Sequence, residues 1–335
     1  MTSGPALPPG AARTARSGGC LLTAIVVTYR NEKDVVGCLA AVGAALDGLP
    51  AEVVMVDNHS DDATVTVARR AFPDVRVERR ERNDGFARAC RAGALLAHGD
   101  WLLFVNPDAL VAPDAVRALV DAAAAHPQAG ILGGRAVLAD GGTDPRSWWG
   151  RPTLWSTLCF AVGLSAAFPG HPVFDPESPE RWAGEAREVP AVSGALMLID
   201  RRAWQQLGGF DEGFLLYGED VDLCLRARHN GWRPRVVPEA TFRHAVGGST
   251  PGPARTVLVM RGRATVVRRH LRPGTRWLGG WLLVVGTGLR AALAGGRRPG
   301  RRRAHTDVAG WQAAWRERSS WRRGWREGDE LEAAS

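Results

Sequence analysis

The run Trp101-Leu-Leu-Phe-Val-Asn-Pro-Asp-Ala109 indicates the fold class more clearly than any other part of the chain. It begins with five apolar residues, which is typical of a strand buried on both faces of a parallel sheet. The strand should end at Asn106-Pro107, because proline donates no backbone hydrogen bond and disfavours helix in the residue before it. Asp108 is therefore expected just beyond the carboxyl end of a central strand, where open α/β sheets bind their ligands.

Asp108 is a candidate metal ligand. One carboxylate, with the Asn106 amide beside it, is a sparse ligand set. Such a set suits a hard ion such as Mg²⁺ or Mn²⁺, which takes its other ligands from water and a diphosphate. The alternative is an aspartate that only shapes the turn after the strand.

Two similar strands precede this one, and each runs into polar residues and then a helical pattern. The expected strands are Thr23–Thr28 and Glu52–Asp57, and the expected helices are Lys33–Leu46 and Ala63–Ala71. This β-α-β-α order predicts an α/β fold with a mostly parallel, Rossmann-like central sheet that is flanked by helices. The loops after the strands should gather at one edge of that sheet.

The polar residues after these strands are candidates for nucleotide binding. Asp57 can accept a hydrogen bond from a pyrimidine N–H or a ribose hydroxyl, whereas Ser60 and Asp61 also fit helix capping. The chain has no Gly-x-Gly-x-x-Gly after its first strand and no Gly-x-x-x-x-Gly-Lys at all. Dinucleotide cofactors and P-loop nucleotide hydrolysis therefore lose support.

The stretch from Gly208 to Arg226 is dense in acids, which a fold keeps together only where cations, hydroxyls or helix N-termini meet them. Glu219 and Asp220 should lie where a loop turns into a helix, whose positive end favours ionised carboxylates. A carboxylate there is a candidate general base, and an N-capping aspartate is the alternative. Asp222 stands one turn from Arg226, which favours a structural ion pair. The acids are Asp211, Glu212, Glu219, Asp220 and Asp222.

Six motifs, taken in chain order, resemble those of family-two glycosyltransferases. The chain is similar in particular to the rhamnosyltransferase-like branch, whose members have the GT-A fold and use nucleotide-sugar donors with inversion. The resemblance covers roughly residues 20–250, and Gly208–Arg226 is its most specific part. The motifs are Thr28-Tyr-Arg-Asn31, Val56-Asp-Asn-His-Ser60, Asn83-Asp-Gly-Phe-Ala87, Asn106-Pro-Asp-Ala109, Ser193-Gly-Ala-Leu-Met197 and Gly208–Arg226.

The resemblance implies a role for each matching position. Asp57 would contact the nucleoside, and Asp108 would hold one divalent ion, Mg²⁺ or Mn²⁺. Asp220 would be the catalytic base and Glu219 would orient the acceptor. His244 resembles a late histidine that joins the metal site in some relatives, although a lone histidine is more often structural. The other positions of the nucleotide-sugar site would be Thr28, Tyr29, Asn31, Glu32, Ser60, Asn83, Gly85, Phe86, Asn106 and Gly194.

The chain departs from the family pattern in two places. Asn106 stands where many such enzymes have the first Asp of an Asp-x-Asp motif, which weakens the case for a metal. Arg91 occupies a position that is often Asn, and it could meet a diphosphate or lie on a helix face. The Gln-x-x-Arg-Trp motif of processive synthases is absent from the sequence, which favours transfer of a single sugar.

The N-terminus and the cysteines indicate the compartment. Residues 1–19 are rich in Pro, Gly, Ala and Arg, which predicts a disordered lead rather than a signal peptide. The five cysteines include no Cys-x-x-Cys pair, so free thiols in a reducing cytosol are the simple interpretation.

An irregular insertion is expected between the strands at 130–138 and 189–199. In GT-A enzymes this part of the chain builds the acceptor side of the cleft, and indole rings stack well on sugars. Packing of the aromatic rings into a local core is the alternative. The aromatic residues are Trp148, Trp149, Trp155, Phe160, Phe168, His171, Phe174 and Trp182.

The region 251–335 is basic and rich in tryptophan, and we expect it to be helical. Its uncharged run Trp277–Leu289 has 13 residues, too few for a span of about 20. The basic flanks instead predict a segment that lies in the interface of an anionic membrane. A helical tail would place its tryptophans on one arc, which also suits contact with an anionic membrane. The alternative is a helix that packs on the catalytic domain. The tryptophans are Trp311, Trp315, Trp321 and Trp325. The net charge of +8 also suits nucleic acid, but no recognised binding module accompanies it.

These observations leave three hypotheses. The first is a cytoplasmic enzyme, peripheral on the inner face of the plasma membrane, that moves one deoxyhexose such as rhamnose from a dTDP- or UDP-sugar to a hydroxyl of a cell-envelope or lipid-linked glycan. The second is a two-carboxylate glycoside hydrolase, which would not need the cluster around Asp57. The third is a non-catalytic scaffold docked on the membrane, which would not need Asp108, Glu219 and Asp220.

Overall fold

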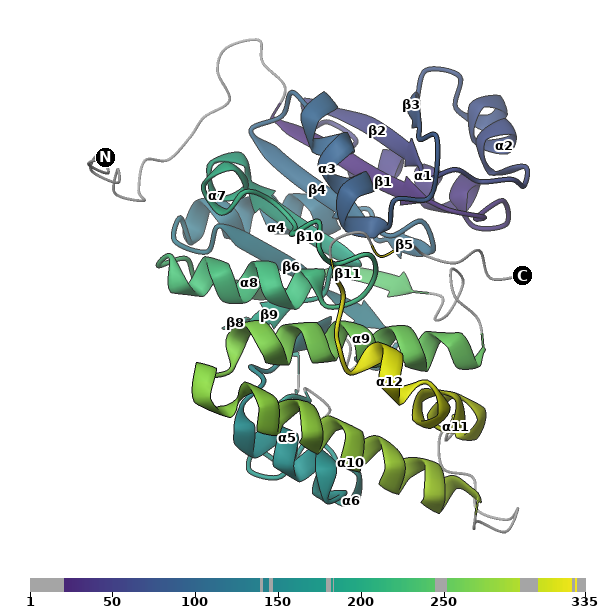
Figure 1. Cartoon of the computed structure of the whole chain (residues 1–335). Coiled ribbons are helices and arrows are strands. Elements are labelled where there is room, and N and C mark those ends of the chain that lie inside the picture. The colour runs from purple at the N-terminus through teal and green to yellow at the C-terminus, as the bar shows by residue number, and fades with distance from the viewer. Residues whose placement is uncertain are drawn as a thin grey trace, which may run out of the picture.

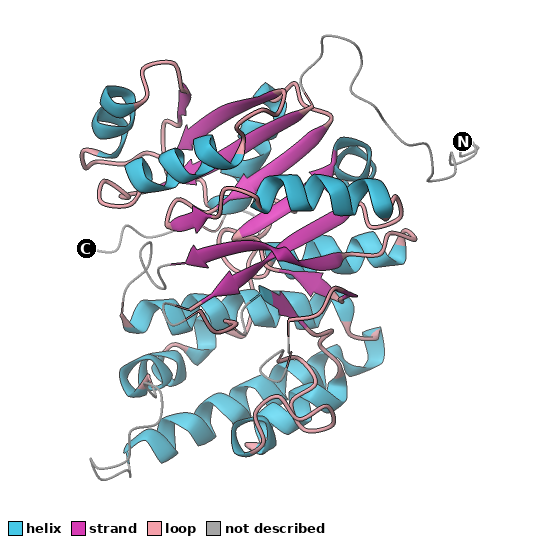
Figure 2. Ribbon diagram, turned by 180° about the vertical axis from the view of Figure 1, so that it is seen from behind, coloured by secondary structure: helices cyan, strands magenta, loops and turns pink. Residues whose placement is uncertain are grey.

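The computed structural model describes residues 21–138, 141–144, 147–178, 182, 184–244, 252–295, 307–326 and 329. The expected lead, residues 1–19, and the side chain of His244 lie outside the described residues. A central sheet with helices on both faces makes up one part of the molecule, and further helices gather at one end of it (Figure 1; Figure 2 gives the opposite view).

The N-terminal half of the sheet is parallel, as the sequence predicts. Its strands are adjacent in the order β3-β2-β1-β4, and every neighbouring pair runs parallel. Because the strands point the same way, their carboxyl ends and the loops after them meet at one edge. The strands are β1 (Leu22–Thr28), β2 (Ala51–Asp57), β3 (Arg76–Arg79) and β4 (Trp101–Val105), and the helices are α1 (Val35–Ala45), α2 (Thr64–Ala71) and α3 (Phe86–Leu96).

The other half of the sheet is mixed. Strand β10 (Leu196–Asp200) lies antiparallel between β4 and β6 (Ile131–Val137), and β11 (Arg235–His244) runs parallel to β6. Strands β5 (Ala109–Val111) and β8 (Arg187–Glu188) both pair antiparallel with β11. The helices of this half are α4 (Ala115–Ala125), α7 (Arg201–Leu207) and α8 (Glu219–His229).

The expectation of one continuous strand over residues 189–199 is wrong. The chain forms β9 (Ala191–Val192), which pairs with β7 (Trp148–Trp149) in a separate small sheet, and then β10. It turns between these strands because the amide of Gly194 donates to Asp220 Oδ2 at 3.0 Å rather than to a neighbouring strand.

The strands alternate their side chains between two apolar cores. On β1, Leu22, Ala24 and Val26 belong to one core, and Ile25 and Val27 belong to the other. Both faces of the sheet are therefore covered, and a ligand can reach the strands only at their ends.

The insertion and the C-terminal region form one helical layer. A third core joins them through Phe160, Leu283 and Trp321. The expectation of an irregular insertion is wrong over residues 154–161, because Thr153 and Ser156 form a capping box that starts a helix there. The helices are α5 (Leu154–Ala161), α6 (Leu164–Ala167), α9 (Pro253–His270), α10 (Arg276–Gly295), α11 (Val308–Arg316) and α12 (Arg318–Trp321), with a 3₁₀ turn at Pro273–Thr275.

The tryptophans of the tail divide between core and surface. Trp321 is 0% exposed and Trp325 is 4% exposed, so the expectation that they face lipid is wrong, and both pack against the domain. Their indoles donate to carbonyls of other segments, as Trp325 Nε1 does to Leu216 at 3.1 Å. Trp277 and Trp281 on α10, in contrast, are 67% and 55% exposed.

Helix α10 is longer than the uncharged run within it. Among the described residues, Pro273–Ala294 is the single stretch whose length and composition would suffice to cross a membrane. The expectation that this segment is too short to span a membrane is wrong on length, because the helix does not stop after the 13 uncharged residues but continues through Arg290 to Gly295.

Candidate active site

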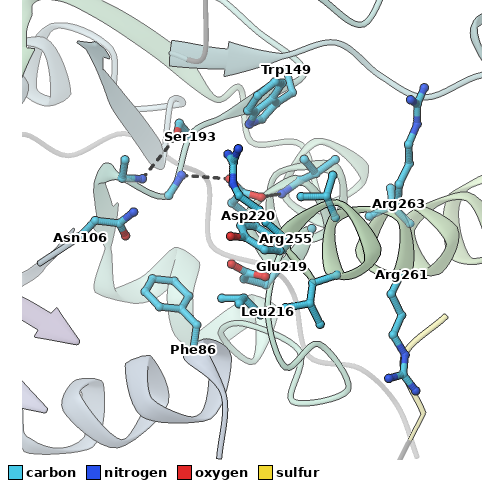
Figure 3. Close-up of a pocket in the computed structure, with 18 of the residues that line it drawn as sticks. Phe86, Asn106, Trp149, Ser193, Leu216, Glu219, Asp220, Arg255, Arg261 and Arg263 are labelled. Carbon is cyan, nitrogen blue, oxygen red and sulfur yellow. Dashed lines mark hydrogen bonds between the residues drawn. The ribbon is translucent and has the colours of Figure 1, made fainter. Parts of the chain in front are cut away.

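A cavity of about 1090 Å³ opens where the carboxyl ends of β1 and β4 face the N-terminus of α8 (Figure 3 shows part of its wall). Asp108 and Asp220, which are more than a hundred residues apart, both line it. Most of the residues that the sequence singles out lie in the same wall. They are Thr28, Tyr29, Asn31, Asn83, Phe86, Asn106, Asp108, Gly194, Glu219 and Asp220.

Four predicted residues do not line this cavity. Asp57 is fully buried and accepts hydrogen bonds from the Thr28 hydroxyl at 3.2 Å and the Ser60 amide at 3.0 Å. Glu32 accepts from the Ala63 amide at 3.2 Å, and the Ser60 hydroxyl accepts from the Arg30 amide at 2.9 Å. These side chains hold the strand-end loops in place, and their direct contact with a nucleoside stays a prediction.

Gly85, the fourth of them, joins the nucleotide side of the cavity to the acidic stretch. Its φ is +86°, and a Cβ atom there would lie 2.5 Å from the Leu215 carbonyl oxygen. The next amide, that of Phe86, donates to the same oxygen at 2.7 Å. Only glycine allows this approach, so the Asn83–Ala87 motif positions the acidic stretch.

The sequence did not reveal Asn58 as part of the wall. Its amide nitrogen donates to Asn83 Oδ1 at 2.7 Å, and its own oxygen accepts from the Asp84 amide at 3.2 Å. Asn58 lines the cavity and links the loop after β2 to the loop after β3. The only sequence signal was its place directly after Asp57.

Asp220 is oriented by one amide from another segment and by the amide of the next residue in its own helix. The Gly194 amide donates to Oδ2 at 3.0 Å, and the Val221 amide donates to Oδ1 at 2.8 Å. Burial raises the pKa of Asp220, and these amides together with the Trp149 side chain partly oppose the rise. A carboxylate that is held in position and has a raised pKa is suited to accept a proton near neutral pH.

Glu219, unlike Asp220, has a carboxylate oxygen that receives no hydrogen bond from the described residues. It is 7% exposed, and its Oε2 atom is buried without a hydrogen-bond partner among the described residues. Burial and the neighbouring Asp220 charge raise the pKa of Glu219 to about 8. This pKa favours the protonated form of Glu219 at neutral pH, in which it can donate a hydrogen bond, and makes Asp220 the candidate for the proton acceptor.

Asp222 is structural, as its spacing to Arg226 predicts. Arg226 Nε lies 2.7 Å from Asp222 Oδ2, and His270 Nε2 lies 2.8 Å from Oδ1. Burial would raise the pKa of Asp222, but the His270 and Arg226 side chains outweigh it and lower that pKa. The contact with His270 connects α8 to the far end of α9, and the sequence did not reveal it.

Arg91 lies outside the cavity. Its Nε atom is 2.6 Å from Glu212 Oε1, which joins α3 to the acidic stretch. Of the two alternatives for this residue, the helix face is the one that the structure supports.

The metal ligands expected from the sequence can be tested only in part. Asp108 lines the cavity beside Asn106 and is 7% exposed. Among the side chains that the structure describes, no group of three or more His, Cys, Asp or Glu is placed to hold a metal ion. One carboxylate and one amide fit a hard ion that takes most of its ligands from substrate and water.

Comparison with known proteins places these features in context. Residues 23–205 match the model of the family described as Glycosyl transferase family 2. The chain is 31% identical over 285 residues to N-acetylglucosaminyl-diphospho-decaprenol L-rhamnosyltransferase of Mycobacterium tuberculosis (strain H37Rv), a match that covers 82% of this chain and 91% of that protein.

Two solved structures are similar in fold. One is the mannosyltransferase PcManGT from Pyrobaculum calidifontis in complex with GDP-Man and Mn²⁺, with a TM-score of 0.54, 18% identity and coverage of 89% of this chain and 87% of that one. The other is GalNAc-T7 with UDP, GalNAc and Mn²⁺, with a TM-score of 0.51 and 16% identity. That match covers 74% of this chain and 48% of GalNAc-T7, so this chain spans about half of its length. The expectation of a GT-A fold is confirmed.

Proposed function

The chain belongs to glycosyl transferase family 2 and is a nucleotide-sugar-dependent glycosyltransferase, and we propose that it transfers a single rhamnose from dTDP-rhamnose to a hydroxyl of a lipid-linked glycan with inversion. The observation that carries the proposal is the one cavity that contains both Asp108 and Asp220. Similarity over most of both chains to a rhamnosyltransferase supports the choice of donor and of acceptor.

The donor would lie along the strand ends. Thr28, Tyr29 and the linked pair Asn58 and Asn83 line the nucleoside end of the cavity. Asp108 and Asn106, at the end of β4, would hold the diphosphate through one Mg²⁺ or Mn²⁺. When bound there, such an ion supplies positive charge against the phosphate that leaves.

Asp220 and Glu219 would carry out the proton transfer. Asp220 takes the proton of the acceptor hydroxyl as that oxygen attacks the anomeric carbon, while the bond from this carbon to the diphosphate breaks. Attack on the side opposite the leaving group inverts the configuration. Glu219, protonated at neutral pH, donates a hydrogen bond that holds the acceptor without competing for its proton.

The acceptor would enter from the side of the insertion. Of the aromatic residues there, Trp149 lines the cavity, whereas Trp148, Phe160 and Trp182 belong to the apolar cores. The Trp149 side chain also interacts with Asp220. We therefore assign acceptor stacking to Trp149 rather than to the aromatic cluster as a whole.

Helix α10 would place the enzyme on an anionic membrane surface in the cytoplasm. Trp277, Trp281 and Val285 are four residues apart and more than half exposed, and thus form one apolar stripe on the helix. Basic residues precede the stripe, and Arg322 lies 5.8 Å from the Trp281 ring. This combination of indole rings and arginines suits the headgroup region.

The packing of α10 favours lying on the bilayer over crossing it. The helix packs against α5, α9 and α11 of the same chain. Near its end, the Arg290 guanidinium donates to the Phe160 carbonyl at 2.7 Å. A segment held this way along a folded domain is not free to insert by itself.

The test is turnover by the full-length chain with dTDP-rhamnose and an N-acetylglucosaminyl-diphospho-lipid acceptor, measured as release of dTDP. We expect release that requires the acceptor, that stops in EDTA and that returns with Mg²⁺ or Mn²⁺. Full activity in EDTA would reject the role given to Asp108. Cleavage of a rhamnoside without any nucleotide would favour the hydrolase. If no dTDP-, UDP- or GDP-sugar raised the melting temperature, a scaffold would be favoured, because a bound ligand stabilises the folded state by mass action.

A further inference from the structure

Three arginines of α9 line the active-site cavity, and they differ in their partners. Arg261 Nη2 lies 2.7 Å from Asp329 Oδ2, and Arg263 Nη2 lies 3.1 Å from both carboxylate oxygens of Glu177. Arg255 lines the same cavity and has no acidic partner among the described residues. Since a guanidinium stays charged at any working pH, Arg255 presents to whatever occupies the cavity a positive charge that no described carboxylate pairs with.

The position of Arg255 decides which substrate it can meet. In Figure 3, Arg255 overlaps Asp220 and points toward Trp149, whereas Asn106 lies apart from all three. The donor diphosphate belongs to the Asn106 and Asp108 side. In an inverting transfer the acceptor approaches from the opposite side of the sugar, so the anion that Arg255 meets belongs to the acceptor.

The surroundings of Arg255 also indicate which chemical group lies beyond the anion. Leu258 and Val259, on the next turn of α9, line the cavity too, and Val259 is 36% exposed. The α9 part of the wall therefore sets apolar side chains next to the basic side chain of Arg255. This combination suits a phosphate that carries a hydrocarbon chain.

We propose that Arg255 binds the phosphate of a glycosyl-diphosphate lipid acceptor and thereby sets the reacting hydroxyl against Asp220. The proposal rests on the proposed function and deepens it, because it requires the anionic group to be attached directly to the sugar that reacts. A neutral glycoside of the same sugar would then lack the main contact that positions it.

The experiment compares Arg255→Ala and Arg255→Lys with the wild type, using dTDP-rhamnose and two acceptors. One acceptor is N-acetylglucosaminyl diphosphate with a short alkyl chain, and the other is the matching alkyl N-acetylglucosaminide without phosphate. The matched control is Arg268→Ala, because Arg268 is an exposed arginine of α9 outside the cavity. Melting curves check that each variant is folded.

We expect Arg255→Ala to raise the KM for the diphosphate acceptor about 10–100-fold, the usual effect of losing a charge-assisted hydrogen bond. The KM for dTDP-rhamnose and the kcat/KM for the neutral acceptor should stay unchanged, and Arg255→Lys should retain part of the effect. A raised donor KM with an unchanged acceptor KM would assign Arg255 to the donor and overturn the inference. Equal losses on both acceptors, or a wild type that uses both equally well, would overturn it as well. A wild type that fails with every diphosphate-linked acceptor would instead refute the proposed function.

Discussion

The two walls of the active-site cavity are built in different ways. On the donor wall, side chains in the loops after neighbouring strands bind each other, as Asn58 does with Asn83. On the acceptor wall the partners come from remote segments. The hydrogen bond between Arg263 and Glu177 joins residues 86 positions apart, and that between Trp325 and Leu216 joins residues 109 apart.

The family match covers the donor wall and the insertion but not the C-terminal helices. The model of the family ends at residue 205, so it includes all four parallel strands and none of α9, α10 or α11. The donor wall is thus a consequence of parallel strands and the loops after them, whereas the acceptor wall depends on how the C-terminal helices pack against the insertion. Five experiments probe this contrast.

The largest effect should come from the side chain that lies between the two walls. Asp220→Asn keeps the shape of the residue but removes the base, so kcat should fall about 10²–10⁴-fold while the KM for the donor stays the same. Glu212→Gln is the matched control, because Glu212 is an exposed acid of the same stretch that pairs with Arg91 outside the cavity. Near-normal turnover in Asp220→Asn would remove Asp220 from the mechanism.

A smaller loss should result from a change on the donor wall. Asp108→Asn should lower kcat/KM about 10²-fold and raise the Mg²⁺ concentration that gives half-maximal activity, because a neutral amide is a poorer ligand for a hard ion. Activity measured against Mg²⁺ concentration gives both quantities. An unchanged Mg²⁺ requirement would mean that Asp108 only shapes the turn after β4.

The contact between His270 on α9 and Asp222 on α8 should contribute to the free energy of unfolding. His270→Ala removes one of the partners that hold the buried Asp222 carboxylate, so the free energy of unfolding should fall by about 2 kcal/mol. Urea denaturation measures this change, with Arg268→Ala as the control on the neighbouring turn. A loss no larger than that of the control would mean that the His270 contact contributes nothing to fixing the catalytic helix.

The two acidic neighbours should produce opposite limbs of the pH profile. Asp220 must be ionised to act as base, so kcat/KM should fall as pH drops through its pKa, which burial raises. Glu219 must keep its proton, so kcat/KM should also fall as pH rises through about 8. Glu219→Gln cannot ionise, so it should keep near-wild-type activity at pH 7 and lose the decline at high pH, about tenfold per pH unit. A basic limb that persists in this variant would contradict the assignment.

The smallest effect should come from changes on α10, and it should alter membrane binding but not turnover. Replacing Trp277 and Trp281 together by Ala should weaken binding to vesicles of neutral and anionic phospholipid about tenfold, because two exposed indoles no longer enter the interface. Turnover of a water-soluble, short-chain acceptor should not change. Leu95→Ala is the control, because Leu95 is 86% exposed on α3 of the donor half. Vesicle sedimentation that does not distinguish the double variant from this control would exclude α10 as the membrane contact.

What could be predicted from the sequence is local. The apolar run that ends at Asp108, the acids that begin α8 and the pair of Asp222 and Arg226 were all predictable, because strand burial, helix starts and one-turn spacings are properties of neighbouring residues. The donor wall and the identity of the candidate base derive from such patterns.

Tertiary structure alone decided the rest. Sequence spacing does not predict that the Gly194 amide and the Trp149 side chain contact Asp220. It does not predict the contact of His270 with Asp222 either. The burial of Trp321 and Trp325 reversed an expectation that rested on composition. Each of these contacts joins segments that are far apart in the sequence and meet only in the folded chain, and a one-dimensional pattern does not contain that geometry.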